Sequence, residues 1–365
     1  MRIAIDARLV SYIQGGTSRY TVSLVQAMAA LGTSHEFIVL EGRKAEGDPG
    51  WPEGVERRRL RTPPHHRHEQ IALPLELLAL GVDLLHSPDF IPPFRRPCRS
   101  VITVHDLAFL RFPELLTPES TRYYSQVGRA VQSADQVIAV SEATRRDLLE
   151  LLKADPAKVT VVYEAAGDDC APLSSRDVAT HRKRLGLPER FILFVGTIEP
   201  RKNLPVLLKA FARVWQKLRV PLVVVGRKGW LYEEVFQTVD SVGLRNEVIF
   251  VGPVDGRQLV YYYNCADCLV LPSLYEGFGL PVLEAMACGT PVVISNVSSL
   301  PEIVGDAGLG VDPSDVEGLA EAVTRVLSDD VLRTHLSQQG LLRARRFSWN
   351  RAARETLAVY RKALA

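Results

Sequence analysis

The sequence contains no long hydrophobic run, no signal peptide and no strong excess of one charge. No apolar stretch approaches the roughly 18–20 residues that a membrane-spanning helix needs. The first residues, MRIAIDARLV, lack the hydrophobic segment and the cleavage site of a signal peptide. The formal net charge is +2, which gives no reason to propose a nucleic-acid partner. These absences favour a globular protein of the cytoplasm.

Cysteine is scarce and scattered. An odd set does not form a disulfide framework, so a reducing compartment is expected. One C-x-x-C could be a redox or zinc pair, but no second pair and no histidine cluster completes a zinc site. The simpler interpretation is two small apolar residues leading into a buried strand. The five cysteines are Cys98, Cys170, Cys265, Cys268 and Cys288, and the C-x-x-C is formed by Cys265 and Cys268.

The chain has 365 residues, of which 47% are hydrophobic and 24% charged, and it is long enough for two soluble domains. Strand-like runs alternate with helical patterns, which predicts an α/β fold with two doubly wound parallel sheets. We expect a first domain at 1–168, a second at 189–346, and a last helix at 347–365. The expected strands are 2–6, 36–40, 57–60, 83–90 with its turn, 101–110, 136–140, 158–162, 191–196, 221–226, 247–254, 268–271 and 292–294. The expected helices are one ending at residue 32 and those at 69–80, 118–133, 145–152, 205–218, 231–242, 257–265, 282–287 and 331–345.

The stretch from Leu271 to Ile294, LPSLYEGFGLPVLEAMACGTPVVI, predicts a strand, a loop, a helix and a second strand. Gly277 and Gly279 leave room for a ligand against the main chain of the loop. Pro281 suits the first helical turn, because its missing N–H is not needed there. The remaining N–H groups of that turn favour an anion, above all a phosphate.

Two carboxylates belong to the same stretch. Glu276 lies in the loop and Glu284 about one turn into the helix, so both are placed to face one ligand. A carboxylate binds sugar hydroxyls well, because it accepts two hydrogen bonds in one plane. The stretch therefore predicts a nucleotide-sugar site. The alternative is an ordinary strand–helix–strand unit with a solvated Glu284 and a capping Glu276.

The pattern E-G-F-G-L-P-x-x-E-A-x-A-x-G-x-P-V, from Glu276 to Val292, resembles the signature of retaining glycosyltransferases of family 4. This resemblance implies the GT-B fold: two Rossmann-like domains facing a cleft, with the last helix crossing back to the first domain. It also implies that Glu284 binds the donor ribose and Glu276 the transferred sugar. Backbone N–H groups of the loop would hold sugar hydroxyls and phosphate, and they belong to Gly277, Phe278, Gly279 and Leu280.

Arg201 and Lys202 lie between the end of a predicted strand and the start of a helix. Their positive charges and the positive end of the helix dipole lie together at the start of this helix, where they would stabilise a leaving diphosphate. No D-x-D stretch of the metal-dependent GT-A type is present, so we expect these cations to replace a metal and no metal cofactor to be required. Many family members have an arginine where this chain has Thr197. Either Arg201 binds the pyrophosphate in place of that arginine, or fewer cations hold the pyrophosphate in this chain. The alternative is a solvated loop.

Two glycine-containing turns are further candidates for donor contacts. Gly15 and Gly16 precede a helix, which is typical of a phosphate loop or of a turn with glycines for geometry alone. In the family, this loop reaches the donor phosphate. The resemblance also places the base against the main chain after the strand at 247–254, which makes Gly252 to Val254 the candidate contact.

His105 and Asp106 follow a strong predicted strand. Open α/β sheets place ligand groups at the carboxyl ends of their strands. The resemblance implies that His105 contacts the transferred sugar, with a loop-capping histidine as the alternative. Asp106 is expected to orient His105 or to cap locally.

The segment at 57–68 is basic and contains prolines. A solvated loop is one interpretation. The other is a patch for an acceptor or for an anionic membrane surface, where each basic residue contributes about 1 kcal/mol. A glycan or lipid-linked acceptor fits this second interpretation.

The donor is chosen by resemblance alone. The sequences G-T-x-E-P-R-K-N and LPEIVGDAG most resemble mannosyltransferases that use GDP-mannose. UDP-glucose and related donors, a GT-B sugar-nucleotide epimerase and a non-catalytic nucleotide-sugar binder stay open. A nicotinamide dehydrogenase is not favoured, because no G-x-G-x-x-G stands at the first strand–helix turn.

Overall fold

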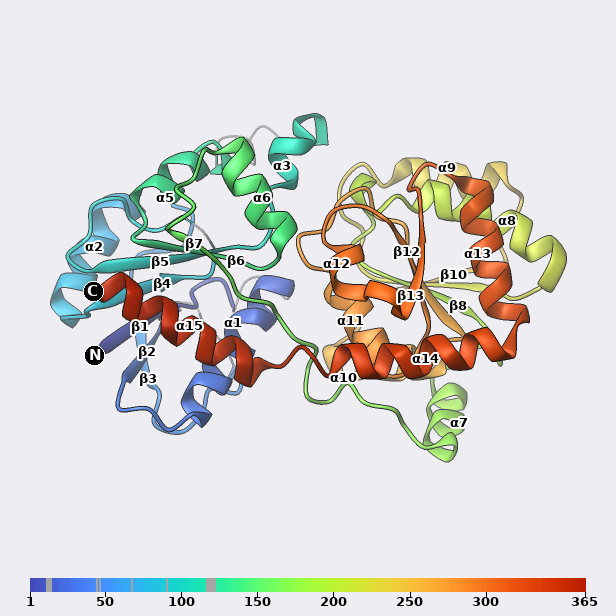
Figure 1. Ribbon diagram of the computed structural model, residues 1–365, viewed down its shortest axis with the longest axis horizontal. Coiled ribbons are helices and arrows are strands. Elements are labelled where there is room, and N and C mark those ends of the chain that lie inside the picture. Colours follow the sequence, from blue (N-terminus) through green and yellow to red (C-terminus); the bar gives the residue numbers. More distant parts are fainter. Residues whose placement is uncertain (11–14, 44, 46, 67, 90, 116–122) are drawn as a thin grey trace. The chain divides into compact units, whose positions relative to one another are not determined.

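The computed structural model describes residues 1–10, 15–43, 45, 47–66, 68–89, 91–115 and 123–365. The chain forms two units (Figure 1). Unit 1 comprises Met1–Glu164 together with Ser348–Ala365, and unit 2 comprises Ala165–Phe347. No helix among the described residues is both long and apolar enough to cross a membrane.

The described strands of unit 1 form a seven-stranded parallel sheet in the order β3-β2-β1-β4-β5-β6-β7. The inner strands are apolar and buried on both faces, as expected when helices cover both sides of a sheet. The strands are β1 (Arg2–Asp6), β2 (Glu36–Gly42), β3 (Glu56–Leu60), β4 (Leu84–Ser87), β5 (Arg99–Val104), β6 (Gln136–Ala139) and β7 (Val159–Val161).

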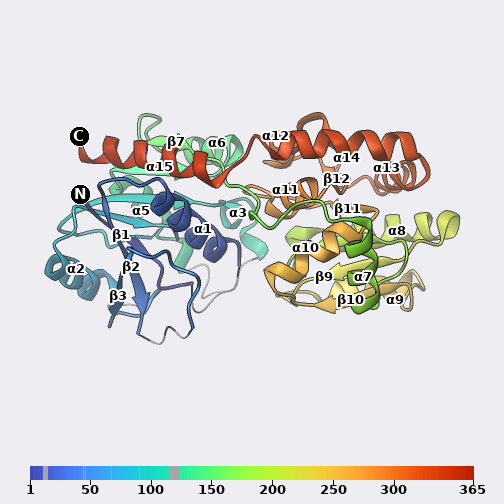
Figure 2. The same ribbon diagram turned by 90° about the horizontal axis from the view of Figure 1, so that it is seen from below.

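Helices cover both faces of this sheet (Figures 1 and 2). α2 packs on the strands β1 to β4, and α5 and α6 pack on β5 and β6. α1 and α15 lie against each other, with α15 on β5 and β6. The helices are α1 (Gly16–Ala30), α2 (Glu69–Leu80), α3 (Ala108–Arg111), the 3-10 turn η1 (Pro113–Leu115), α5 (Val127–Ser133), α6 (Glu142–Leu151) and α15 (Trp349–Leu364).

A buried hydrogen-bonded chain fixes α15 in unit 1. Tyr360 Oη lies 2.7 Å from His86 Nδ1, and His86 Nε2 lies 2.8 Å from Thr103 Oγ1. The hydroxyl of Tyr20 joins the same threonine at 3.0 Å. Burial and the nearby charge of His105 lower the pKa of His86 to about 3, so its ring is neutral. The predicted return of the last helix to the first domain therefore has a specific polar anchor, which the sequence pattern did not reveal.

The described strands of unit 2 form a six-stranded parallel sheet in the order β10-β9-β8-β11-β12-β13. The four inner strands are buried throughout, whereas the edge strands β10 and β13 are partly exposed. The strands are β8 (Ile192–Val195), β9 (Leu222–Val225), β10 (Val248–Gly252), β11 (Cys268–Leu271), β12 (Val292–Ser295) and β13 (Gly308–Val311).

The helices of unit 2 follow the predicted alternation. α11 has Pro281 in its first turn, and Gly289 after it has a positive φ of 80°, as a glycine after a helix end often does. The helices are α7 (Ser175–Arg184), the 3-10 turn η2 (Pro200–Lys202), α8 (Leu204–Leu218), α9 (Glu233–Ser241), α10 (Gly256–Cys265), α11 (Leu280–Ala287), α12 (Leu300–Val304), the 3-10 turn η3 (Gly305–Ala307), α13 (Val316–Ser328) and α14 (Asp330–Ala344).

Three sequence expectations need correction. The stretch between the predicted domains is not a plain linker, because it contains α7, capped by Ser174, and belongs to unit 2 from Ala165 on. The predicted strand at 101–110 ends at Val104, and α3 follows it. The predicted helix at 118–133 lies outside the described residues up to 122, and a turn at Ser125 and Gln126 interrupts the rest before α5 begins.

Gly226 allows β8 and β9 to end close together. Its φ is 149°, and a Cβ there would lie 1.9 Å from the carbonyl oxygen of Gly196. We expect Gly226→Ala to lower the free energy of unfolding by more than about 2 kcal/mol, because backbone strain and a clash act together. Urea unfolding followed by circular dichroism measures this.

Gly256→Ala is the matched control. A Cβ at Gly256 would meet no heavy atom within 4 Å, and the residue begins α10. We expect the control to leave stability unchanged or to raise it by up to about 1 kcal/mol. Equal stability of the two variants would contradict the assigned role of Gly226.

Candidate functional site

Arg201, Lys202 and Glu276, three of the predicted site residues of unit 2, meet at the carboxyl ends of β8 and β11, which are neighbours in the sheet. η2 follows β8 and carries Arg201 and Lys202, and the loop after β11 carries Glu276. Lys202 Nζ lies 2.6 Å from Glu276 Oε1, and Arg201 Nη1 lies 3.4 Å from Glu276 Oε2. The strand order reverses between β8 and β11, and such a point is where open α/β sheets bind ligands.

The ion cluster contains a second carboxylate, which sequence reasoning missed. Glu199 Oε1 lies 2.8 Å from Arg201 Nη2, so the guanidinium is held between Glu199 and Glu276. The side chains of Lys202, Glu199 and Glu276 are all buried. We define the ion cluster as Glu199, Arg201, Lys202 and Glu276. Its two cations and two carboxylates balance in charge, as a buried group of ions requires.

Glu276 is ionised in this cluster. Burial by itself raises the pKa of its carboxyl, but the charges of Lys202 and Arg201, together with hydrogen bonds from Lys202 and Ser273, outweigh burial and hold the pKa below its ordinary value. The Ser273 hydroxyl donates to Glu276 Oε1 at 2.6 Å. Glu276 is therefore an anion at neutral pH, with its oxygens occupied by donors of this chain.

The loop that carries Glu276 is held by hydrogen bonds with three residues outside it, Arg201, Ser298 and Ser299. The Arg201 carbonyl accepts from Leu274 N at 2.9 Å, and the Ser298 hydroxyl accepts from Glu276 N at 2.9 Å. The Ser299 hydroxyl lies 2.9 Å from both the Glu276 and the Phe278 carbonyl oxygens, to which it donates. These two serines stand directly before the stretch LPEIVGDAG, and no role was predicted for them.

The glycine loop takes the shape that its residues predict. Gly279 has a φ of 103° and precedes the first turn of α11, where a Cβ would lie 2.7 Å from Leu300 Cδ2. Gly277 and Phe278 are buried, and Leu280 is half-buried. The main chain at 277–280 therefore lies beside the ion cluster at the start of a helix, where partial positive charge favours an anion.

Glu284 is one turn into α11 and almost wholly buried. Its Oε2 accepts a hydrogen bond of 2.8 Å from the hydroxyl of Tyr263 on α10. A run of three tyrosines, as at 261–263, is typical of packing residues, and for Tyr263 that interpretation leaves out this hydrogen bond. The alternative of a solvated Glu284 is wrong.

The predicted base-contact turn follows β10. Gly252 has a φ of 85°, and its carbonyl accepts from Gly226 N at 2.9 Å. The pairing of β10 with β9 shifts register between Phe250 and Gly252, and Val254 is half-buried after the strand. The turn is adjacent to the carboxyl end of β9, on the same edge of the sheet as the ion cluster.

In unit 1, His105 follows β5 and its partner is a residue that sequence reasoning missed. His105 Nδ1 lies 2.8 Å from Glu164 Oε1, and the Tyr20 ring meets the imidazole edge-on with centroids 4.8 Å apart. His105 Nε2 is buried and has no hydrogen-bond partner among the described residues. Asp106 accepts from Ala108 N at 3.0 Å, so it caps α3 locally.

Glu164 raises the pKa of His105. Burial lowers the pKa of the imidazole, but the hydrogen bond and the charge of Glu164, with smaller contributions from Asp89 and Asp106, outweigh burial and raise it. With Nδ1 directed at a carboxylate, Nε2 is the atom left to meet a ligand. Glu164 follows β7 at the same edge of the sheet, and this position is the signal that could have identified it.

Gly15 and Gly16 stand at the start of α1, as predicted. Gly15 is in an extended conformation and is the N-cap, and its carbonyl accepts from Arg19 N at 3.1 Å. Gly16 is the first helical residue. Residues 11–14, which precede these two glycines, lie outside the described residues.

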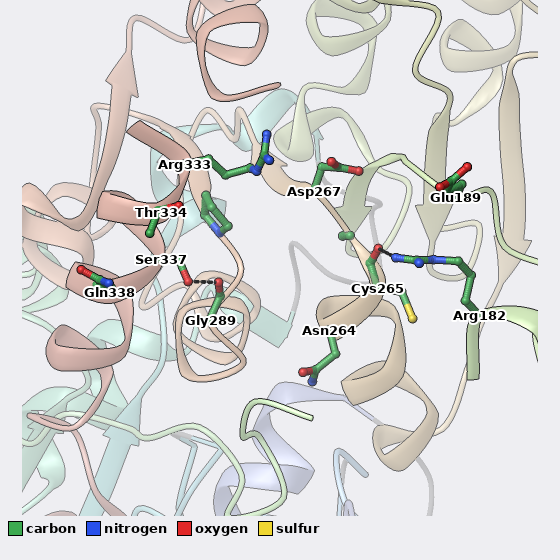
Figure 3. A pocket seen from close by; sticks show the side chains of 12 residues that line it. Arg182, Glu189, Asn264, Cys265, Asp267, Gly289, Arg333, Thr334, Ser337 and Gln338 are labelled. Carbon is green, nitrogen blue, oxygen red and sulfur yellow. Dashed lines mark hydrogen bonds between the residues drawn. The ribbon is translucent and has the colours of Figure 1, made fainter. Parts of the chain in front are cut away.

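A polar pocket of about 440 Å³ lies elsewhere in unit 2, near the amino ends of β11 and β12 (Figure 3). Its lining groups bond to one another: Arg182 donates to the Cys265 carbonyl at 3.1 Å, and the Ser337 hydroxyl to the Gly289 carbonyl at 2.6 Å. It includes no predicted site residue. Among the residues with described positions, no group of three or more His, Cys, Asp or Glu side chains is arranged to hold a metal ion.

Comparisons with known proteins show the family to which the chain belongs. Residues 14–166 match the family described as Glycosyltransferase Family 4, and residues 177–343 match Glycosyl transferases group 1. The chain is 35% identical over 282 residues to O-antigen chain mannosyltransferase B of Escherichia coli, covering 76% of this chain and 74% of that protein. It is 31% identical over 401 residues to D-inositol 3-phosphate glycosyltransferase of Kineococcus radiotolerans, covering 96% of this chain and 91% of that one.

The solved structure of sucrose-phosphate synthase from Thermosynechococcus elongatus superimposes with a TM-score of 0.82 at 25% identity, over 99% of this chain and 98% of that chain. Both units therefore have the Rossmann-like architecture of the GT-B fold, as predicted. The sequence matches extend through both units, and they include the ion cluster and the glycine loop. The chain belongs to glycosyltransferase family 4 and is a glycosyltransferase.

Removing one cation tests the ion cluster. We expect Lys202→Met to lower the free energy of unfolding by about 1–3 kcal/mol at neutral pH, because Glu276 stays buried with one fewer partner. The wild-type cluster contributes stability above the pKa of the unfolded carboxyl and loses it as the pH falls through the lower folded pKa. The variant should therefore lose less stability on acidification. Urea unfolding at several pH values measures both effects.

Lys209→Met is the matched control, because Lys209 is exposed on α8. Its effect should stay within about 0.5 kcal/mol. If both lysine variants are as stable as the wild type at every pH, the cluster does not hold Glu276 as described.

Replacing Glu164 tests its effect on His105. We expect Glu164→Gln to lower the pKa of His105, because the carboxylate that outweighs burial is gone. A raised folded pKa contributes stability below the unfolded pKa, and this contribution is lost as the pH rises through the folded value. The free energy of unfolding of the variant should therefore fall less than that of the wild type as the pH rises through this range. Histidine NMR titration, with His105→Asn to assign the signal, measures the pKa, and an unchanged value would contradict the assignment.

Proposed function

We propose that the protein is a retaining mannosyltransferase that transfers mannose from GDP-mannose to a glycan or lipid-linked acceptor. The observation that carries the proposal is the charge-balanced ion cluster, which lies beside residues 277–280 at the start of α11. It offers two cations to a diphosphate and one carboxylate to a sugar at the same point. The name of the Escherichia coli relative supports mannose as the transferred sugar.

The ion cluster suggests how the donor engages. A diphosphate carries more charge than one carboxylate, so Arg201 and Lys202 would turn from Glu276 to the phosphates when the donor binds. Glu276 would then accept hydrogen bonds from hydroxyls of the transferred sugar. Main-chain groups of Gly277, Phe278, Gly279 and Leu280 would hold the same sugar and phosphate, together with Gly15 and Gly16.

The other predicted donor contacts take defined roles in this proposal. Glu284, fixed by Tyr263, would bind the ribose hydroxyls, and the main chain from Gly252 to Val254 would contact the base. His105, oriented by Glu164, would donate from Nε2 to a hydroxyl of the transferred sugar.

In the proposed reaction the acceptor hydroxyl attacks the anomeric carbon from the face that the diphosphate leaves. The bond from that carbon to the phosphate oxygen breaks, and the bond to the acceptor oxygen forms. The acceptor proton passes to a phosphate oxygen of the departing GDP. Arg201 and Lys202 stabilise the charge that grows there, so no metal is required.

The acceptor has two candidate forms. The basic segment 57–68 is proposed to contact an anionic membrane surface, which suits a lipid-linked acceptor. A second candidate is a phosphorylated polyol, because the match to the Kineococcus radiotolerans relative named D-inositol 3-phosphate glycosyltransferase covers nearly the whole chain. Presence or absence of transfer to each acceptor class distinguishes them.

Nucleotide binding tests the proposed donor. We expect GDP, and not UDP, ADP or dTDP, to stabilise the protein in a thermal-shift titration, with no dependence on magnesium. A ligand at about a hundred times its Kd adds about 2.7 kcal/mol. Stabilisation by UDP alone would replace the donor and keep the site. Stabilisation by none of the four would contradict a nucleotide-sugar site.

A further inference from the structure

Tyr20 is a buried aromatic residue that contacts His105 and takes no part in the proposed reaction. It lies one turn after Gly16 in α1. Its ring meets the imidazole of His105 edge-on, with the ring centroids 4.8 Å apart and the ring planes at 86°. Because protein interiors are closely packed, an aromatic ring at this distance limits how far the imidazole can turn.

Thr103 fixes the hydroxyl of Tyr20. Tyr20 Oη lies 3.0 Å from Thr103 Oγ1, and both side chains are buried. Thr103 stands two residues before His105, and alternate residues of an extended chain point to the same side of a sheet. Tyr20 therefore meets Thr103 with its hydroxyl and His105 with its ring. Burial raises the pKa of Tyr20, so its hydroxyl keeps its proton.

The hydrogen bonds continue from Thr103 to α15. A threonine hydroxyl carries one proton and can also accept. Thr103 therefore donates to one of its two partners, Tyr20 Oη or His86 Nε2, and accepts from the other. His86 Nδ1 in turn meets the hydroxyl of Tyr360 on α15. Each hydroxyl of this chain has a partner, so each one restrains the next.

α15 also contacts the ring of Tyr20 directly. Trp349 is the first residue of α15 and is buried. Its ring lies at 66° to that of Tyr20, with the centroids 5.8 Å apart. The helix that returns to unit 1 thus restrains Tyr20 through Trp349 at one point and through the chain from Tyr360 at another.

His105 is held at its backbone and at one ring nitrogen. Its carbonyl accepts from the Thr144 hydroxyl at 3.3 Å, and Nδ1 lies 2.8 Å from Glu164 Oε1. With these two points fixed, the angle of the ring decides where Nε2 points. Any turn of the imidazole that breaks the bond to Glu164 also moves Nε2.

We propose that Tyr20 is a positioning residue for His105. Its ring, fixed by Thr103 and by Trp349 of α15, holds the imidazole on Glu164, so that Nε2 meets the transferred sugar. The contact with a sugar rests on the proposed function. The hold on the imidazole does not depend on it.

Histidine NMR of the full chain without ligand tests the hold on the imidazole. Tyr20→Leu removes the ring, whereas Tyr20→Phe keeps the ring and removes only the hydroxyl. A bond to Glu164 keeps the proton of neutral His105 on Nδ1, so the nitrogen signals should report this one tautomer in the wild type and in Tyr20→Phe. Tyr20→Leu should show both tautomers, and its carbon-bound imidazole protons should shift because the neighbouring ring current is lost.

Phe37→Leu is the matched control. Phe37 is a buried aromatic residue on β2, which β1 and β4 separate from β5 in the sheet. This control should leave the His105 signals as in the wild type. Tyr20→Met fills more of the vacated space and is the second variant without the ring, to be used if Tyr20→Leu does not fold. Unchanged His105 signals without the ring would overturn the proposal, as would the same change in Phe37→Leu.

Ligand binding tests the consequence for the site. Calorimetric titration compares GDP with GDP-mannose. Tyr20→Leu should bind GDP as the wild type does and GDP-mannose roughly tenfold more weakly, which is about 1.4 kcal/mol, because the hydrogen bond from Nε2 to the sugar is misaligned. Tyr20→Phe and Phe37→Leu should keep both affinities.

A double variant separates positioning from a general loosening of the fold. If Tyr20 acts through His105, Tyr20→Leu combined with His105→Asn binds GDP-mannose no more weakly than His105→Asn alone. Losses that add would overturn the proposal. Unchanged GDP-mannose affinity in Tyr20→Leu with altered His105 signals would overturn only the contact of Nε2 with the sugar. A wild type that binds neither ligand would overturn the proposed donor alone, because the NMR comparison needs no ligand.

Discussion

The contact between Glu276 and the two cations after β8 is the interaction on which the site depends. It joins the loop after β11 to the turn after β8 by side chains that are largely buried. Opposite charges at this depth must balance, because an unpaired ion there costs several kcal/mol. Glu199 completes the balance by holding Arg201 from the other side. The cluster is therefore a structural link between the two strand ends, and in the proposed function its two cations are offered to the diphosphate.

The backbone around the cluster makes this arrangement possible. Gly196 and Gly226 let the ends of β8 and β9 approach, and Gly279 lets the chain turn into α11 beside Leu300. The serines at 298 and 299 hold the main chain on which Glu276 stands. A carboxylate, two cations and a helix start thus converge at one edge of the sheet.

The sequence predicted the repeating α/β architecture, and it assigned Arg201, Lys202 and Glu276 to one donor. Their direct contact follows from strand order, because neighbouring strand ends in a parallel sheet share one edge. It did not predict Glu199 or Glu164, whose partners are set by side-chain direction and by strand order. It also did not predict the hydrogen bond of Tyr263, since the sequence pattern is the same for a tyrosine that only packs. α7 was missed because it has a polar surface with no buried residue, so it has no hydrophobic period.

The measurement that tests the central claim most directly is calorimetric titration of GDP into the wild type, Lys202→Met and Glu276→Gln. If the cations pass from Glu276 to the diphosphate, Lys202→Met weakens GDP binding roughly tenfold or more, which is about 1.4 kcal/mol. Glu276→Gln then binds GDP at least as tightly as the wild type, because no carboxylate competes for the cations. Wild-type affinity in Lys202→Met, or GDP binding lost in Glu276→Gln, would contradict the account.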